Sequence, residues 1–481
     1  MSIILWTDAL VFVLIACALA AARYVSRREY LLSSWRRVGE SRAGMAALTV
    51  LSAFILVGLL DSLHYRPRLE AVAGKSTNAA NGYSTEVRSA LDMLLMPLKS
   101  GTEKTYSAPL ATHLYARETV ELPDGTQARV FPRLKHGGAH LKAPAEDWLR
   151  DVVAKTLLGL ALAVLAGLTF TGIAVQAVAR HWNVPWRTAR GRIWRGETRF
   201  AWNAVLVTTA ALLLIAGPVV ALAGSYHVFG TDKVGQDVLY LTLKSIRTGL
   251  VIGTITTLAM LPFAVALGIA AGYLGGWVDD VIQYLYTTLN SIPGVLLIAA
   301  AVLMMQVVID THPDWFATAA QRADARLLAL CLILGVTSWT GLCRLLRAET
   351  LKLRELEYVQ AAQAFGASAA RIMGRHILPN VMHIVLISVV MDFSGLVLAE
   401  AVLSYIGIGV DPSTISFGTM INTARLELAR EPVVWWSLVA AFVFMFILVL
   451  AANLFSDAVR DAFDPRLAGR QVVPATQGQA T

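Results

Sequence analysis

The stretch AWNAVLVTTAALLLIAGPVVALA, residues 201–223, contains no charged side chain along its whole length. About 20 predominantly apolar residues are enough for a helix to cross the hydrocarbon core of a bilayer, so this stretch predicts a transmembrane helix. The composition of the 481-residue chain agrees, because 56% of its residues are hydrophobic and only 15% are charged. Soluble domains contain roughly 25% charged residues. The chain is therefore predicted to be a membrane protein.

Eight further apolar runs lie on either side of this stretch, and each is a candidate crossing. They occupy residues 3–22, 44–60, 152–179, 247–271, 281–309, 327–346, 381–404 and 433–455. The predicted fold class is an all-α membrane protein, a polytopic bundle of about nine transmembrane helices.

Basic residues gather in three connections between these runs, and cytoplasmic loops of membrane proteins collect Lys and Arg. The three groups are Arg23, Arg27, Arg28, Arg36, Arg37 and Arg42; Arg180, Arg187, Arg190, Arg192, Arg195 and Arg199; and Arg344, Arg347, Lys352, Arg354, Arg371 and Arg375. All three fall on one side of the membrane only if the N-terminus is periplasmic and the C-terminus cytoplasmic. The same rule accounts for the net charge of +8, so membrane lipid is expected as a partner and nucleic acid is not.

This topology exports residues 62–150, which are predicted to form a small α+β periplasmic insert. Val87, Leu91, Leu94, Leu95 and Leu98 recur at helical spacing and predict an amphipathic helix. Residues 119–130 predict two short strands around a Pro-Asp-Gly turn.

The rest of the chain divides at composition changes. Residues 1–61 hold the first two helices, which are interpreted as accessory, and residues 151–224 hold the third and fourth. Residues 225–468 hold most of the informative motifs and are predicted to form the functional core. The tail at 469–481, rich in Gln, Ala and Thr, is predicted to be disordered.

No catalytic residue, metal site or cofactor site is predicted. Gly74-Lys75-Ser76 lacks the glycine that a phosphate-binding loop needs five residues earlier, where Leu69 stands. The exported histidines are separated by an irregular glycine-containing loop, so they are interpreted as solvated surface residues. These are His113, His136 and His140.

The strongest local signal lies in the cytoplasmic loop 357–380. The Ala-rich segment 356–365 predicts a helix, and Gly366 is expected to end or turn it. Residues 367–376 predict a second helix, which should stop because Pro379 disfavours helical angles at the preceding Leu378. The resulting small-residue face, Ala361, Ala362 and Gly366, suits close docking by another protein. An amphipathic helix lying on lipid is the alternative.

This loop resembles the EAA signature of permease subunits of ATP-binding-cassette importers, in which two short helices fit a cleft on the cytoplasmic ATPase. The residues that match the pattern are Gln360, Ala361, Ala362, Gly366, Leu378 and Pro379. Gln360 departs from the pattern, because the family often has Glu there. A neutral amide keeps the hydrogen-bonding reach of Glu but loses its charge.

The resemblance spans 225–468 and sharpens to the C-type permeases of dipeptide, oligopeptide and nickel importers. Segments similar to that group lie at residues 230–239, 272–279, 398–400, 407–409 and 461–466. Members of the group typically have one helix before the first of these segments, and a subset has an enlarged exported segment. This chain has four helices and the insert, and the resemblance does not cover them.

Charged residues inside a bilayer are costly and are candidates for function. Asp392 and Glu400 lie eight residues apart on one predicted helix, so both carboxylates could line one wall of a passage. The alternative for each is a buried acid hydrogen-bonded to a neighbouring helix. Asn290 stands close to Pro293, where a hinge, a path-lining kink or a simple packing kink could form.

The resemblance implies a bacterial inner-membrane permease subunit that is not itself an enzyme. It implies four kinds of partner: a second, B-type permease, two cytoplasmic ATPase subunits, a periplasmic solute-binding protein, and peptides as cargo. Nickel or another small solute is the alternative cargo. An ion-gradient-driven transporter, with Asp392 and Glu400 relaying protons, is the alternative class, although the inverted repeats usual in such folds are not evident. A membrane-anchored sensor with a ligand-binding insert is a third hypothesis.

Overall fold

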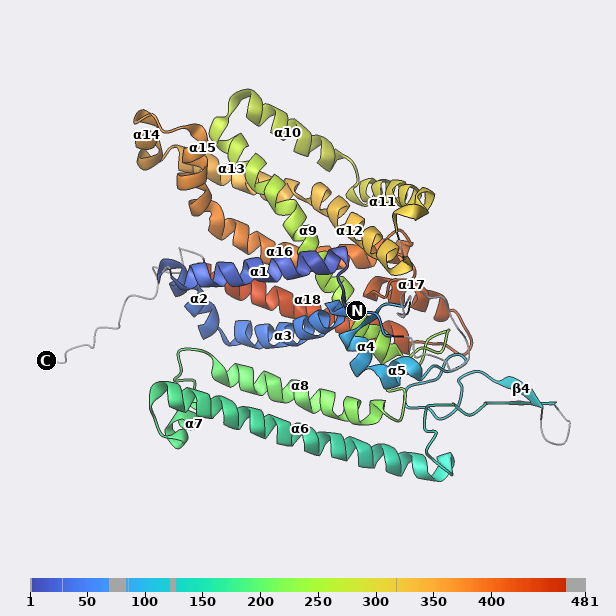
Figure 1. Ribbon diagram of the computed structural model, residues 1–481. Helices are drawn as coiled ribbons and strands as arrows, with labels where there is room; N and C mark the ends of the chain where they lie inside the picture. The colour runs from blue at the N-terminus through green and yellow to red at the C-terminus, as the bar shows by residue number, and fades with distance from the viewer. Residues whose placement is uncertain are drawn as a thin grey trace.

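The computed structural model describes residues 2–27, 29–68, 84, 86–121, 127–316 and 318–463. This part of the chain is mostly helical (Figure 1), and it contains nine helices that are long and apolar enough to cross a membrane. The predicted helix bundle of about nine crossings is therefore confirmed. The nine spans are Trp6–Arg23, Arg42–Ser62, Pro144–Trp182, Trp202–Ala223, Val238–Leu274, Gly294–Thr311, Ala319–Arg354, Ala369–Ile406 and Trp436–Phe463. The predicted tail at 469–481 lies outside the described residues.

The sixth predicted run, 281–309, is not one helix. It is divided between α10 (Gly276–Ser291) and α11 (Gly294–Thr311), with Ile292 in an extended conformation between them. Pro293 causes the break, because a proline disfavours helical angles at the residue before it. Only α11 is a membrane span, so Asn290 lies at the end of α10 and not within a crossing helix.

Helix α9 (Val238–Leu274) lies at the centre of the bundle, where it packs against α12 (Ala319–Ser338), α13 (Thr340–Arg354) and α16 (Leu378–Ile406). Two of its glycines allow α13 to approach closely. A Cβ atom at Gly268 would lie 2.8 Å from the carbonyl oxygen of Cys343, and one at Gly272 would lie 2.6 Å from Cβ of Thr350. Small residues at four-residue spacing are typical of such close contacts between membrane helices.

The N-terminal helices form successive layers beside this core (Figure 1). Helix α3 (Arg42–Ser62) packs against α9 and α18 (Trp436–Phe463). Helices α6 (Pro144–Trp182) and α8 (Trp202–Ala223) form an antiparallel hairpin that meets α3 through α8. A Cβ atom at Gly159 of α6 would lie 2.6 Å from the carbonyl oxygen of Gly217 of α8, so this pair also packs closely. Three shorter or flanking helices complete the N-terminal part: α1 (Trp6–Ser26), α2 (Glu29–Glu40) and α7 (Trp186–Arg195).

The segment between α3 and α6 contains both helices and strands. Two of its strands, β2 (His64–Tyr65) and β3 (Arg88–Ser89), form a small antiparallel sheet with β1 (Ser2–Ile3), which precedes α1. The predicted strands around the turn are present as β4 (Glu118–Glu121) and β5 (Gln127–Val130), in antiparallel register. The residues of the turn itself, 122–126, lie outside the described residues.

The prediction of a single amphipathic helix in this segment is wrong. The structure has two short helices, α4 (Ala90–Leu94) and α5 (Met96–Ser100), which meet at Leu95. Pro97 stands in the first turn of α5, where its missing N–H costs nothing but where it prevents α4 from continuing.

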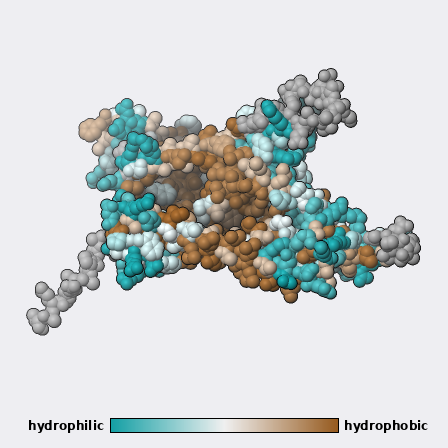
Figure 2. Space-filling model, turned by 60° about the horizontal axis from the view of Figure 1, so that its bottom comes forward, coloured by the Kyte–Doolittle hydropathy of each residue, from teal (hydrophilic) through white to brown (hydrophobic). Residues whose placement is uncertain are grey.

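The elements separate toward two ends of the bundle (Figure 1). Helices α2, α7 and α14 (Glu357–Ala364) lie at one end, here called the loop end, and α4, α5 and β4 lie at the other, here called the insert end. Figure 2 shows a band of apolar residues between polar residues at both ends, and the band is hollowed on the face in view.

Candidate functional site

The predicted docking loop is a helix–turn–helix that projects at the loop end. Its first helix, α14, is followed by Gly366, whose φ of +79° lies in the left-handed region that favours glycine. The second helix, α15 (Ala369–Ile372), follows after a short extended segment. Gly366 ends the first helix, as predicted.

The second helix does not stop before Leu378, so that prediction is wrong. A π-helical turn (Met373–Ile377) follows α15 and leads directly into α16, and Leu378 itself is helical with φ −50° and ψ −46°. Pro379 stands in the first turn of α16. The wider π turn accommodates the missing backbone N–H of the proline. Such π turns are frequent at functional sites. The second helix of the loop is therefore continuous with the membrane helix α16.

The inner side of the loop is fixed to the core. Val359, Ile372 and Ile377 are fully buried, in one apolar cluster with residues of α9 and α13. Of the predicted small-residue face, Ala361 and Gly366 are exposed, whereas Ala362 is half-buried against the same cluster. The anchored side leaves the opposite side of the loop open to another protein.

Phe365 is the residue of the loop that the sequence argument did not single out. Its side chain is 91% exposed, more than that of any other large apolar residue in the described part of the chain. Its position immediately before a helix-ending glycine is visible in the sequence but does not by itself indicate exposure. A projecting aromatic side chain in a fixed position is typical of the residues that anchor protein interfaces.

Gln360 has a local role that explains its departure from the pattern. Its side-chain Nε2 donates a hydrogen bond to the backbone carbonyl of Glu355, at 3.3 Å. That carbonyl lies just after the last residue of α13, where carbonyls lack helical partners. A Glu carboxylate could not donate this bond, so the amide is suited to this position.

The base of the loop is tied to the turn at the start of α10. Both carboxylate oxygens of Asp279 accept hydrogen bonds from Arg347 of α13, at 2.5 and 2.6 Å. These hydrogen bonds lower the pKa of Asp279 from its ordinary value. At the other side of the loop, Nδ2 of Asn380 donates to the Tyr358 hydroxyl and to the His376 carbonyl, at 3.1 and 2.6 Å.

The three candidate path residues have different surroundings. Asp392 is half-buried in the middle of α16 and makes no hydrogen bond or ion pair with any residue the structure describes. Asn290 is exposed, and its Oδ1 accepts a hydrogen bond from the Thr340 hydroxyl at 3.1 Å. The two residues therefore differ, because Asn290 has a partner within the chain and Asp392 has none among the described residues.

Glu400 is buried and fully engaged within the chain. Its side chain is 1% exposed, and Oε1 accepts hydrogen bonds from the Ser404 hydroxyl at 2.7 Å and the Ser416 hydroxyl at 2.9 Å. Ser416 is the N-cap of α17 (Phe417–Glu427), so Glu400 connects α16 to that helix. Its geometry matches the alternative of a buried acid bonded to a neighbouring helix.

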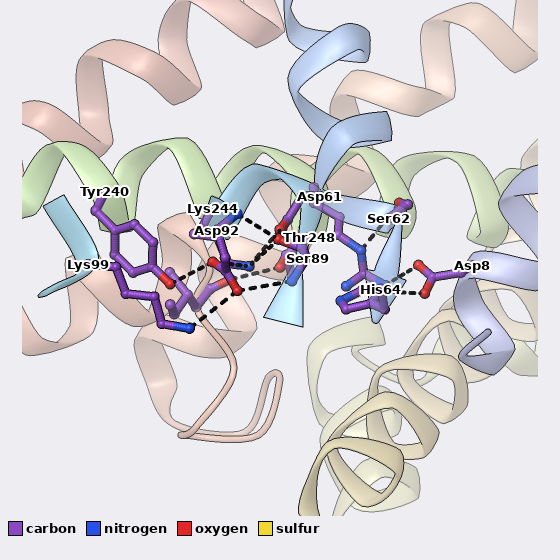
Figure 3. A network of polar contacts seen from close by, with 12 residues as sticks. Asp8, Asp61, Ser62, His64, Ser89, Asp92, Lys99, Tyr240, Lys244 and Thr248 are labelled. Carbon is purple, nitrogen blue, oxygen red and sulfur yellow. Dashed lines mark hydrogen bonds and ion pairs between the residues drawn. The ribbon is translucent and has the colours of Figure 1, made fainter. Parts of the chain in front are cut away.

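A network of ion pairs joins the N-terminal helices to the core at the insert end (Figure 3). Nζ of Lys244, on α9, lies 2.5 Å from Asp61 of α3 and 3.2 Å from Asp92 of α4. Burial acts to raise the pKa of Asp92, but the charge of Lys244 helps to outweigh it, and the pKa falls to about 2. One helical turn along α9, Arg247 pairs with Asp8 of α1 at 2.5 Å. Sequence reasoning missed this network, because its members lie in four helices that are far apart in the chain.

Residues 227–237, which precede α9, connect the segment between α3 and α6 to the core. Asp237 is the N-cap of α9 and also lies 2.7 Å from Nδ1 of His227. Nε2 of His227 is 3.5 Å from Oε1 of Glu103, an ion-pair distance without hydrogen-bond geometry. Burial disfavours the imidazolium, but the two carboxylates outweigh burial and raise the pKa of His227 to about 9. The Thr231 hydroxyl further accepts a hydrogen bond from the backbone N–H of Ser107, at 2.7 Å.

The histidines of the segment between α3 and α6 are not brought together. His140 lies 2.8 Å from Asp151, and His113 lies beside Thr112. Within the described ranges no group of three or more His, Cys, Asp or Glu side chains is placed to hold a metal ion.

Comparison with known proteins places these features in one family. Residues 264–469 match the family described as "Binding-protein-dependent transport system inner membrane component". The chain is 32% identical over 242 residues to the oligopeptide transport system permease protein OppC of Mycobacterium bovis, covering 50% of this chain and 77% of that protein. It is 31% identical over 240 residues to the dipeptide transport system permease protein DppC of Lactococcus lactis, covering 50% and 64%.

Two further similarities extend the comparison. The glutathione transport system permease protein GsiD of Pectobacterium atrosepticum is 30% identical over 243 residues, which cover 50% of this chain and 74% of that protein. A solved structure of the MetNI methionine ABC transporter in an inward-facing conformation is 15% identical, with a TM-score of 0.35, and covers 47% of this chain and 97% of that one.

Proposed function

The chain belongs to the binding-protein-dependent transport system inner membrane components, and from this premise we propose that it forms, with a second permease, the path by which peptides enter the cell. As a member of the family it is the multi-pass, inner-membrane permease component of an ATP-driven importer, and it is not itself the ATPase. Such a system also contains an ATPase, a binding protein and a partner permease.

The observation that carries the proposal is the exposed helix–turn–helix at the loop end. We propose that a cytoplasmic ATPase docks on Gln360, Ala361, Gly366 and the projecting Phe365, with Ala362, Leu378 and Pro379 supporting them from the inner side. The π turn joins this surface to α16, the helix that carries Asp392. A displacement of the docked helix would therefore move a membrane helix directly. Two ATPase subunits, one for each permease, are expected.

The proposed orientation places the loop end in the cytoplasm, with the N-terminus periplasmic and the C-terminus cytoplasmic. The segments that carry the three arginine groups lie at that end of the bundle (Figure 1), as the enrichment of basic residues in cytoplasmic loops requires. The insert end would then receive the solute-binding protein.

Peptides are the proposed cargo because the permeases that this chain resembles at about 30% identity are named for oligopeptides, dipeptides and glutathione. We propose that Asp392 faces the path, because it is half-buried within a membrane helix and has no partner among the described residues. Asn290, exposed near the break between α10 and α11, is a second candidate. Glu400 instead acts in holding α17 to α16.

We propose that residues 225–468 form the translocation core. Residues 1–61, 62–150 and 151–224 would then be additions to it, the first and third as accessory helices and the second as an exported insert. The ion pairs in Figure 3 support a fixed attachment of these additions, because they join α1, α3 and α4 to α9.

Uptake into proteoliposomes tests this function. The chain is purified with its copurifying subunits, reconstituted, and supplied with a labelled oligopeptide and the binding protein. Uptake should require ATP on the side of the membrane that carries the loop end and its ATPase. It should persist when ionophores remove all ion gradients. Uptake that requires an ion gradient in the presence of ATP would refute the proposal in favour of a secondary transporter.

A variant of the loop tests the docking surface within the same assay. Phe365→Ala should lower both ATPase copurification and uptake, because it removes the projecting side chain without disturbing the buried side of the loop. Trp194→Ala is the matched control, since Trp194 is a 54% exposed aromatic residue of α7 at the same end. Equal losses in the two variants would contradict a specific role for the loop.

A further inference from the structure

Two connections of the N-terminal part meet at the loop end and form one surface. The connection between α1 and α3 contains α2, and the connection between α6 and α8 contains α7. The backbone N–H of Ala201 donates to the carbonyl of Gly39 at 2.9 Å, and Arg199 lies 3.8 Å from Glu40. A Cβ atom at Gly39 would lie 2.3 Å from the ring of Phe200, so the two connections are in close contact.

The basic side chains of this surface are all arginines. We call them the arginine surface: Arg23, Arg27, Arg36, Arg37, Arg42, Arg180, Arg187, Arg190, Arg192, Arg195 and Arg199. The same two connections hold only three acidic residues, Glu29, Glu40 and Glu197. The positive charge is therefore largely uncompensated.

Few of these arginines have an acidic partner in the part of the chain that the structure describes. Two loose pairs are present, Arg195 with Glu197 at 4.0 Å and Arg199 with Glu40 at 3.8 Å. Three cations of the core at the same end do have acidic partners: Arg347 lies 2.5 Å from Asp279, Lys352 lies 2.9 Å from Glu349, and Arg354 lies 3.3 Å from Glu355. The arginine surface thus carries guanidinium groups that an external anion could neutralise.

Helix α7 holds its part of the surface in a fixed position. Ala189 and Ile193 are fully buried in a cluster with residues of α6 and α8, so the helix is packed and its opposite side is presented outward. Trp186 and Trp194 are 41% and 54% exposed on that helix, and the Arg190 guanidinium lies 4.9 Å from the centre of the Trp186 ring. Exposed tryptophans interleaved with arginines are typical of helices at the membrane–water boundary.

The position of α7 indicates which anion is available. Membrane helix α6 ends at Trp182 and membrane helix α8 begins at Trp202, so α7 lies where the chain leaves and re-enters the bilayer. Lipid phosphates occupy this level. Clusters of four to eight basic residues immediately beside a membrane helix attract anionic lipids, and the guanidinium fork matches a phosphate oxygen pair.

We propose that the arginine surface is a binding site for the headgroups of anionic phospholipids. It lies entirely in the helices outside 225–468, so it assigns those helices a lipid-anchoring role. Because each arginine near a membrane surface contributes about 1 kcal/mol of attraction, loss of one headgroup contact should weaken association about five-fold.

The test measures lipid selectivity by electron paramagnetic resonance on the full chain, reconstituted in phosphatidylcholine with spin-labelled lipid. The association constant of spin-labelled phosphatidylglycerol should exceed that of spin-labelled phosphatidylcholine. A variant with glutamine at four exposed arginines of α7 should bring the ratio of the two constants closer to unity by at least the roughly five-fold that the loss of a single arginine contact implies. The four positions are Arg187, Arg190, Arg192 and Arg195.

A matched control removes four exposed cations at the insert end and should leave the ratio unchanged. Its substitutions are Arg117→Gln, Arg129→Gln, Lys135→Gln and Lys142→Gln. Equal association of the two lipids with the unmodified chain would overturn the proposal and would favour an acidic protein or nucleic acid as the ligand. Equal effects of the test and control variants would overturn it as well.

A measurement on the unmodified chain avoids any dependence on the folding of a variant. Raising the ionic strength from about 0.01 M to about 1 M shortens the Debye length from about 30 Å to about 3 Å. The preference for phosphatidylglycerol should fall over this range. A preference that salt does not change would show that the arginines are not its cause.

Discussion

Replacing Lys244 with methionine would remove the one cation that two buried carboxylates share. Asp61 and Asp92 are 3% and 4% exposed, and Lys244 lies 2.5 Å and 3.2 Å from them. Methionine keeps a similar volume and flexibility but carries no charge. The variant therefore isolates the electrostatic contribution of this contact between α9, α3 and α4.

The expected cost follows from the burial of the two acids. Breaking a buried ion pair by removal of one partner costs about 3–5 kcal/mol, because a charge is left in a poorly solvated position. The lower figure applies here, since Asp61 still accepts a hydrogen bond from Ser89 and Asp92 still accepts one from Tyr240. In the open form, α4 is undocked from α3 and α9. A cost of about 3 kcal/mol corresponds to an increase of about two orders of magnitude in the population of this form.

Hydrogen–deuterium exchange of peptides covering residues 86–100 measures this opening directly. The backbone N–H of Ala90 donates to the carbonyl of Leu63 at 2.9 Å, so its protection depends on the docking of α4 beside α3. Exchange of this region in Lys244→Met should be about 100-fold faster than in the unmodified chain. Lys99→Met is the matched control, because Lys99 is more exposed and its pairs with Glu86 and Asp92 are longer.

The control should change the free energy of opening by less than about 1 kcal/mol, as exposed ion pairs usually do. Adding Asp61→Asn to Lys244→Met should restore part of the protection, because it removes one of the two uncompensated charges. Unchanged exchange in Lys244→Met would refute the reasoning. So would an equal effect of Lys99→Met.

Four further perturbations test other parts of the structure. Gly366→Trp should abolish ATP-dependent uptake, because a Trp side chain would obstruct the docking surface and strain the turn at φ +79°. Membrane insertion, measured by fractionation, should stay normal, because no atom lies within 4 Å of the Cβ position and the strain is confined to an exposed loop; normal uptake would contradict docking at the loop. The raised pKa of His227 should make attachment of the segment between α3 and α6 strongest below pH 6.5 and progressively weaker as pH rises through about 9, as measured by hydrogen exchange. His227→Gln should remove that dependence, and a pH response that persists in it would exclude His227 as the cause. Gly272→Val should lower the thermal midpoint in detergent, at a cost of about 1–3 kcal/mol, because its Cβ would lie 2.6 Å from that of Thr350, whereas Gly172→Val, in open space, should not. Deleting residues 118–130 should reduce uptake without abolishing it, and complete loss in an assembled complex would make the hairpin essential for delivery.

One feature of the proposed docking loop could be predicted from the sequence. The helix-ending role of Gly366 follows from its own conformational freedom and from the Ala-rich segment before it. The exposure of Phe365 could not, because an aromatic residue beside a glycine is equally compatible with burial in a neighbouring helix. The continuation of the helix through Leu378 also escaped, since the preference of a residue before proline is weak and the packing of Ile372 and Ile377 overrides it.

The two membrane carboxylates show the same limit. Asp392 and Glu400 have equivalent positions in the sequence pattern, one in each half of an apolar run. Glu400 is satisfied by Ser416, which belongs to a different helix, whereas Asp392 has no such neighbour among the described residues. Nothing in the local sequence of either acid indicates this difference.

The sequence by itself determined the membrane class, the number of crossings and the grouping of the basic loops at one end. These properties depend on the transfer of each segment into the bilayer, a sum of contributions that every residue makes separately. The tertiary structure alone decided which charges are paired and which face outward. Lys244 pairs with Asp61 and Glu400 bonds to Ser416, whereas the arginines of α7 have a single acidic neighbour, Glu197, among the residues that the structure describes. Pairing depends on distances between segments far apart in the chain, and these distances exist only after the helices have packed.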